Sequence, residues 1–195
     1  MSLAILIVLA LGILGGMFMP LEISSFLDQA SSGMLLILLF SVGIDLGLNR
    51  QAFVQIRQMG FRILLIPFGV ILGSLCGGAI AAVLSQTQLK EGFAIVAGLG
   101  WYSLSGILIT NAGNPVGGTV SFLSNVFREM ITFIFVPFIV KYLNSYCAIA
   151  PAGATAMDTT LGIISKHTDG KTAVIAFVSG VICTLVVPVL VPLFL

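Results

Sequence analysis

The chain alternates long apolar runs with short polar connections from one end to the other. A hydrocarbon core about 30 Å thick requires about 20 apolar residues of helix, and seven runs approach that length. The pattern therefore predicts an all-α, polytopic helical membrane protein with one transmembrane domain over residues 1–195. We expect its helices over residues 3–19, 32–48, 63–84, 93–110, 117–140, 148–165 and 172–195.

Two of these segments are interrupted by helix-breaking residues. Residues 98–118 combine several glycines with Pro115, and residues 150–162 combine Pro151 with small and hydroxyl residues. Broken backbone is tolerated in a bilayer only where protein buries it or where it lines a water-filled cavity, as in many secondary transporters. If both segments cross there are seven spans, and if both re-enter there are five. The positive-inside rule mildly favours re-entry, which places Lys141 on the cytoplasmic side.

The basic residues of the connections predict the orientation. Arg50, Arg57 and Arg62 lie in one connection that contains no acid, and two lysines lie in residues 166–171. Connections rich in Lys and Arg face the cytoplasm. We therefore expect a cytoplasmic N-terminus and an external C-terminus. The first apolar run lacks a basic start, so we interpret it as a helix rather than a cleaved signal.

Composition narrows the possible functions. The chain is 58% hydrophobic and 8% charged, with a mean hydropathy of +1.19, which leaves too few charges to cover a soluble domain. A net charge of +1 offers no basic face for nucleic acid. Cys76, Cys147 and Cys183 show no metal-ligand spacing. We expect no metal and no cofactor.

Arg128 and Glu129 stand side by side in the middle of an apolar run. On a helix over residues 117–140, Glu129 lies about 18 Å from each end, at mid-membrane depth. Intramembrane acids usually mark ion or substrate pathways. Adjacent helical residues do not face one another, so each charge needs a partner on another segment, and Asp158 is an available acid for Arg128. We interpret Glu129 as functional and Arg128 as structural.

Asp158 lies in the second broken segment, next to Thr159. Unwound backbone can offer carboxylate, hydroxyl and carbonyl oxygens to a cation or an ammonium group. The same carboxylate can also cap a half-helix, and the two interpretations are compatible. Trp101 and Tyr102, in the first broken segment, are either interface aromatics or a cavity wall with cation-π capacity.

These features favour a transporter over an enzyme. An intramembrane protease would need a serine and histidine pair or two catalytic aspartates at membrane depth, and His167 lies in a charged connection. A sodium or proton antiporter and a passive cation-selective channel remain open alternatives. The two carboxylates suit lysine, arginine, ornithine, a polyamine or a metal cation equally.

Four stretches carry a resemblance to a known family. They are GLGWYSLSGILIT (98–110), the NPVGG that follows, NVFREMITFIFVP (125–137) and GATAMDTTL (153–161). In this order and at these separations they resemble the lysine exporter family LysO of bacterial inner membranes. The resemblance runs over roughly the whole chain and is strongest from residue 92 onward.

The resemblance implies export of L-lysine and of its analogue thialysine, with proton antiport as the coupling. The two intramembrane acids of the family fall on Glu129 and Asp158, so we expect these to couple protons to transport. The resemblance also implies that the second broken segment is a solvent-exposed stretch within the membrane, which favours re-entry. We expect the rest of the substrate to be bound by Trp101, Tyr102, Ser103, Ser105, Asn111 and Thr159.

The chain departs from the family in one respect. Full-length members carry additional membrane helices before the matched region. Exposed broken segments need protein around them, so we expect a small membrane subunit, or a homodimer, to supply that part. The other expected partners are L-lysine, protons and the lipid bilayer.

Overall fold

The computed structural model describes residues 60–195 continuously, together with isolated positions between residues 7 and 54. The chain divides into two compact units, residues 1–42 and residues 43–195, and the elements discussed below belong to the second. The helices expected over residues 3–19 and 32–48, and the basic connection with Arg50 and Arg57, lie outside the continuously described residues.

Residues 60–195 are helical and contain no strand. Their elements in chain order are η1 (Phe61–Leu64), α4 (Leu65–Ser85), α5 (Leu89–Val96), α6 (Tyr102–Asn111), α7 (Pro115–Tyr142), η2 (Tyr146–Ile149), η3 (Gly153–Met157), α8 (Leu161–His167) and α9 (Gly170–Leu193). Within the described residues, three helices are long and apolar enough to cross a membrane: α4, α7 and α9. The predicted helical membrane fold is confirmed, and these three helices match the apolar runs 63–84, 117–140 and 172–195.

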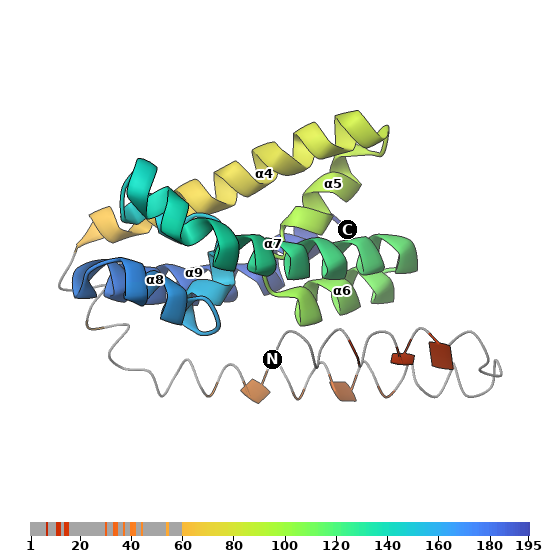
Figure 1. Ribbon diagram of the computed structural model, residues 1–195. Helices are drawn as coiled ribbons and strands as arrows, with labels where there is room; N and C mark the ends of the chain where they lie inside the picture. The colour runs from red at the N-terminus through yellow and green to blue at the C-terminus, as the bar shows by residue number, and fades with distance from the viewer. Residues whose placement is uncertain are drawn as a thin grey trace. The chain divides into compact units, whose positions relative to one another are not determined.

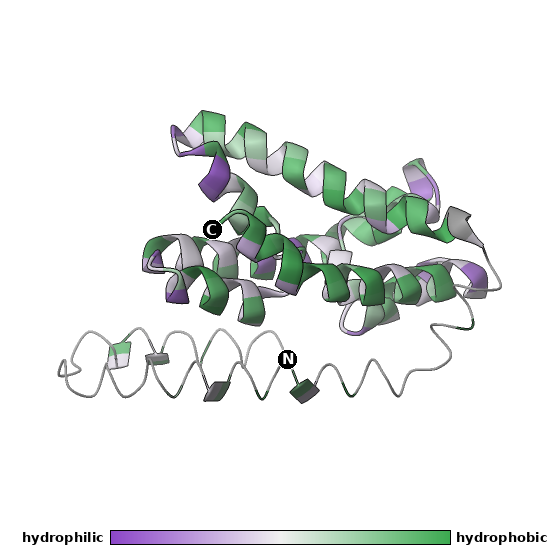
Figure 2. Ribbon diagram, turned by 180° about the vertical axis from the view of Figure 1, so that it is seen from behind, coloured by the Kyte–Doolittle hydropathy of each residue, from purple (hydrophilic) through white to green (hydrophobic). Residues whose placement is uncertain are grey.

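Local sequence sets the starts of the two longest helices. Asn114 caps α7 by accepting a hydrogen bond from the Gly117 N–H at 2.8 Å, and Pro115 occupies the first turn, where its missing N–H costs nothing. Asp169 caps α9 by accepting from the Thr172 N–H at 2.7 Å. Figure 2 shows hydrophobic residues along the helices and hydrophilic ones gathered mainly at the turns.

The run predicted as one helix over residues 93–110 forms two short helices, α5 and α6, separated by residues 97–101. Leu99 and Gly100 have positive φ angles of 48° and 103°, which a helix cannot accommodate. The chain then turns back, because Asn114 Nδ2, just after α6, donates to Glu91 Oε1 in the first turn of α5 at 2.8 Å. The α5–α6 hairpin therefore starts and ends at the same end of the bundle (Figure 1).

The run predicted over residues 148–165 is broken in the same way into η2, η3 and α8. Its two ends lie at the same end of the bundle, because Ile149 from η2 and Ile164 from α8 belong to one apolar cluster with Val136 of α7 and Ile175 of α9. Both broken segments thus return to the end where they begin, which is the geometry of the re-entrant alternative. We call α5–α6 the first hairpin and the segment from η2 to α8 the second hairpin.

The two hairpins enter from opposite ends. Lys141 lies in the last turn of α7, Lys166 in the last turn of α8, and Lys171 at the start of α9. These three lysines gather at one end, which we call the basic end. The α5–α6 hairpin starts from the opposite end, beside the end of α9, where the Phe93 and Phe194 ring centroids lie 5.2 Å apart.

The breaks of the two hairpins cross in the middle of the bundle, backbone against backbone. The Ala154 N–H donates to the Leu99 carbonyl oxygen at 2.8 Å. Gly153 has a φ of 60°, and a Cβ at that position would meet the Leu99 carbonyl. A Cβ on Gly100 would lie 3.1 Å from the Ala152 carbonyl oxygen. Glycine is thus required on both sides of this close approach.

Candidate functional site

Glu129 lies near the middle of α7, on the face that packs against the other helices, and only 6% of its surface is exposed. The opposite face of the helix carries exposed apolar side chains such as Phe127 and Ile131. The carboxyl group of Glu129 therefore lies midway along α7, as the sequence predicted, and its side chain points into the protein.

Asp158 ends η3, within the second hairpin, and its side chain is exposed. Its Oδ1 accepts a hydrogen bond from the Thr159 N–H, so the carboxylate serves partly as a local cap. The Asp158 and Glu129 carboxylates also lie close enough to act on one another electrostatically. Two elements distant in sequence thus bring the two predicted acids together.

Two hydroxyl groups accompany the carboxylates. Tyr102, the first residue of α6, is half-buried and lies within electrostatic range of both acids. Its ring packs edge-on against that of Phe122, with centroids 5.4 Å apart. The Thr159 side chain also acts on both acids, yet its buried Oγ1 has no hydrogen-bond partner of ordinary geometry among the described residues. An unsatisfied buried hydroxyl is costly unless a ligand completes it.

Arg128 does not pair with Asp158 as the sequence suggested, and it forms no ion pair within the described part of the chain. Its Nε donates to the Pro151 carbonyl oxygen at 2.7 Å, and its Nη2 donates to the Ala150 carbonyl oxygen at 3.1 Å. Its Nη1 donates to Ser74 Oγ of α4 at 2.9 Å. A guanidinium carries five donors in a fixed fork, so it can hold unwound backbone whose carbonyls lack helical partners. Arg128 thus connects α7, α4 and the second hairpin.

Ser105 lies in a polar network that the sequence did not reveal. It is fully buried, and its Oγ accepts hydrogen bonds from Ser121 Oγ at 3.1 Å and from Asn125 Nδ2 at 3.4 Å. Asn125 Oδ1 accepts from the Gly100 N–H at 2.7 Å, which fixes the first break. Ser121, Asn125 and Glu129 follow one another at intervals of four, so the helical spacing was the signal that could have identified Asn125.

The remaining predicted substrate residues are spread along α6. Trp101 precedes its first residue and Ser103 lies in its first turn, both half-buried and near the crossing. Asn111 is the last residue of α6 and is exposed, about 13 Å along the helix from Tyr102. The structure therefore gathers Tyr102 and Thr159 around the acids and places Asn111 at the far end of the hairpin.

The chemical character of the site follows from these groups. Within the described residues, no three His, Cys, Asp or Glu side chains lie together as a metal site would require. The groups around the crossing are two carboxyls, a phenol and an alcohol, together with an aromatic face. Oxygen acceptors beside an aromatic ring suit an ammonium group.

Comparison with known proteins gives the family. The family model described as "Lysine exporter LysO" matches residues 6–195. "Lysine exporter LysO" of Escherichia coli (strain K12) is 36% identical over 166 residues, which are 85% of this chain and 55% of that protein. A Haemophilus influenzae protein named "Putative lysine exporter" is 34% identical over 162 residues, 82% of this chain and 81% of the relative. The chain thus spans about half the length of the first relative.

No solved structure matches. By the match over almost its whole length, the chain belongs to the LysO lysine exporter family.

Proposed function

We propose that this chain exports L-lysine, and analogues such as thialysine, across the bacterial inner membrane in exchange for protons. The observation that carries the proposal is that Glu129 and Asp158 lie within electrostatic range of one another, beside the crossing of the two hairpins. Family membership and the names of the two relatives support lysine as the substrate.

The substrate carries two ammonium groups and one carboxylate, so a site with two acids can pair both of its positive charges. In our proposal Glu129 and Asp158 accept hydrogen bonds from ammonium groups, Thr159 Oγ1 supplies a further oxygen, and the Tyr102 ring faces the cation. Charged hydrogen bonds of this kind are roughly twice as strong as neutral ones, which favours a cation over a neutral amino acid.

Proton exchange follows from the same two carboxyl groups. A proton that enters from outside and binds to either carboxylate neutralises it, and a neutral carboxyl group holds an ammonium group less tightly. Release of lysine outward and of the proton inward then completes one exchange. The basic end, with Lys141, Lys166 and Lys171, faces the cytoplasm in this proposal, which leaves the N-terminus inside and the C-terminus outside.

Everted membrane vesicles test the proposal. Lysine added to respiring vesicles, whose lumen is acidic, should release protons from the lumen and accumulate inside, both followed with a pH-sensitive dye and radiolabelled lysine. Glu129→Gln and Asp158→Asn should each abolish both signals while the protein stays in the membrane. Asp169→Asn, which changes an exposed acid at the basic end, is the matched control and should keep both.

The alternatives give different results in the same vesicles. Lysine flux that follows its own gradient without proton movement would identify a passive channel, and proton release driven by sodium but not by lysine would identify a cation antiporter. Full activity in Glu129→Gln or Asp158→Asn would remove that residue from the coupling.

We also propose that a second polypeptide, either a small membrane subunit or a second copy of this chain, completes the protein around the hairpins. Broken backbone at membrane depth requires protein or water around it. Purification of the tagged chain in mild detergent should yield a complex with that subunit or a dimer. A transport-active monomer purified alone would refute this part.

A further inference from the structure

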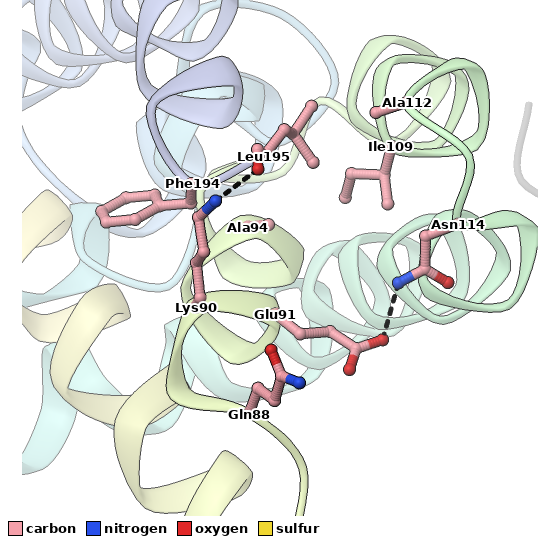
Figure 3. Close-up of a pocket in the computed structure, with 9 residues that line it drawn as sticks. All are labelled: Gln88, Lys90, Glu91, Ala94, Ile109, Ala112, Asn114, Phe194 and Leu195. Atoms are coloured by element: carbon pink, nitrogen blue, oxygen red, sulfur yellow. Dashed lines mark hydrogen bonds between the residues drawn. The ribbon is translucent and has the colours of Figure 1, made fainter.

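A cavity of about 330 Å³ opens at the end of the bundle opposite the basic end (Figure 3). It lies between the start of α5, the end of α6 and the end of α9. The residues that line it include Lys90, Glu91, Ala94, Ile109, Asn114 and Phe194. A cavity of this size is within the range of small-molecule sites, and none of these residues belongs to the crossing described above.

The two charged side chains of the cavity are directed away from one another. Glu91 reaches toward Asn114, whereas Lys90 reaches toward the chain end, where its Nζ donates to the backbone oxygen of Leu195 (Figure 3). Consecutive helical residues project in different directions, which keeps the charges apart on separate walls. A ligand that pairs with both must therefore carry a negative and a positive group with a spacer between them, and its negative group must replace the Leu195 oxygen on Lys90.

The acidic wall is held in place by hydrogen bonds. Asn114 Oδ1 accepts from the Gly117 N–H at 2.8 Å, which fixes the amide group, and its Nδ2 donates to Glu91 Oε1 at 2.8 Å. One carboxylate oxygen is thereby oriented, and the other has no protein partner among the described residues. A fixed carboxylate with a free oxygen suits an ammonium group.

Apolar side chains form part of the floor between the charges. Ala94 of α5 and Ile109 of α6 are buried beneath the cavity, with 2% and 1% of their surfaces exposed. Phe194 packs its ring against Phe93 and closes one side. Methylene groups gain about 0.8 kcal/mol each on leaving water for such a surface. An aliphatic spacer therefore fits between the charges.

We propose that this cavity is an exit-side binding site for an amino acid whose carboxylate and terminal ammonium group are separated by methylene groups. The carboxylate binds Lys90, the terminal ammonium binds Glu91, and the methylene groups lie over Ala94 and Ile109. Lysine has this shape, so the inference rests on the proposed function and makes the cavity the last site that the exported product occupies.

The buried face of α7 connects this cavity with the acids. Asn114 at the cavity and Glu129 at the crossing are 15 residues apart, or about 22 Å along the helix. Ser121 and Asn125 lie between them on the same buried face and hydrogen-bond one another there. Lys90 is exposed and Glu91 half-exposed, so solvent weakens both contacts, as release of a product requires.

Protection of an introduced cysteine tests the proposal on the purified full chain in detergent. Ala112 lines the cavity and is exposed, so Ala112→Cys should react with a maleimide, and lysine should slow that reaction. The unsubstituted chain gives the background from the native cysteines. Leu143→Cys, exposed at the basic end, is the matched control and should react at the same rate with and without lysine.

The ligand series and the variants separate the possible causes of protection. In the Ala112→Cys chain, 5-aminovalerate should protect as lysine does, whereas glycine and cadaverine should not. Glu91→Gln and Lys90→Met should each raise the half-protecting lysine concentration by about two- to fivefold. Asp169→Asn, at the basic end, should leave it unchanged. Protection lost in Glu129→Gln but kept in Glu91→Gln, equal protection by glycine or cadaverine, or no protection at all would overturn the proposal.

The two proposals fail separately in these experiments. Protection at residue 112 without lysine-driven proton release would refute the proposed export and leave the cavity as an amino-acid site. Proton release without protection would refute the cavity site alone.

Discussion

Replacing Gly153 by alanine tests whether the crossing of the two hairpins holds the protein together. The φ of 60° at this position disfavours any residue with a Cβ by about 1–2 kcal/mol. The new methyl group would also meet the Leu99 carbonyl. To avoid it the hairpins must separate, and the Ala154 N–H would lose its hydrogen bond to Leu99, at a cost of about 1–3 kcal/mol for a buried unpaired group. We expect a total loss of about 2–5 kcal/mol.

Gly162 provides a matched control in the same hairpin. It lies in α8 with a helical backbone, and a Cβ there meets nothing within 4 Å. Alanine at an open helical position is neutral or stabilises by up to about 1 kcal/mol. The two glycine-to-alanine variants should therefore differ by about 2–6 kcal/mol in the free energy of unfolding.

Thermal unfolding in mild detergent measures this difference. For a chain of this size about 3 kcal/mol corresponds to a Tm difference of about 6–12 °C. Gly153→Ala should also reduce the fraction of monodisperse protein and lysine transport. Equal Tm values for Gly153→Ala and Gly162→Ala would refute the backbone contact on which the crossing is built.

Three further changes have expected outcomes. Asn125→Ala leaves the amide that it caps unpaired and should destabilise the protein by about 1–3 kcal/mol, measured by unfolding in detergent, whereas Ser124→Ala on the same helix should change little. Arg128→Lys cannot reproduce the fork of three hydrogen bonds and should lower both Tm and transport; wild-type values would show that the guanidinium shape is unimportant. Asp169→Ala should lower Tm at neutral pH but not in acid. Hydrogen bonds from Thr172 hold the pKa of the Asp169 carboxyl below its usual value, so its stabilisation is present above the unfolded pKa of about 3.9 and is lost as pH falls through the folded pKa. A Tm difference that persists in acid would contradict that account.

The membrane helices were predictable because their signal is local. The apolar runs 63–84, 117–140 and 172–195 became α4, α7 and α9 with ends within a few residues, since length and hydropathy alone decide such helices. Gly and Pro also marked the two broken segments correctly, because these residues disfavour a helix whatever surrounds them.

The contacts between segments were not predictable, because one sequence does not reveal which residues meet. Arg128 was matched with an acid on charge alone, yet its partners are the Ser74 hydroxyl and two backbone carbonyls, and a carbonyl is present in every residue and so leaves no mark in the sequence. Ser105 is predicted to orient the substrate together with Ser103 and Asn111. The structure adds what the sequence did not reveal, which is that Asn125 and Ser121 donate hydrogen bonds to its hydroxyl.

The hydrogen bond between Ala154 and Leu99 has a consequence for how the protein is made. The first hairpin and all of α7 are synthesised before the second hairpin exists, and membrane chains leave the ribosome N-terminus first. Until Ala154 emerges, the Leu99 carbonyl must be satisfied by water or by another protein. The α5–α6 hairpin therefore lacks this backbone partner until then, and we expect a chain that ends before Gly153 to accumulate less than the full chain.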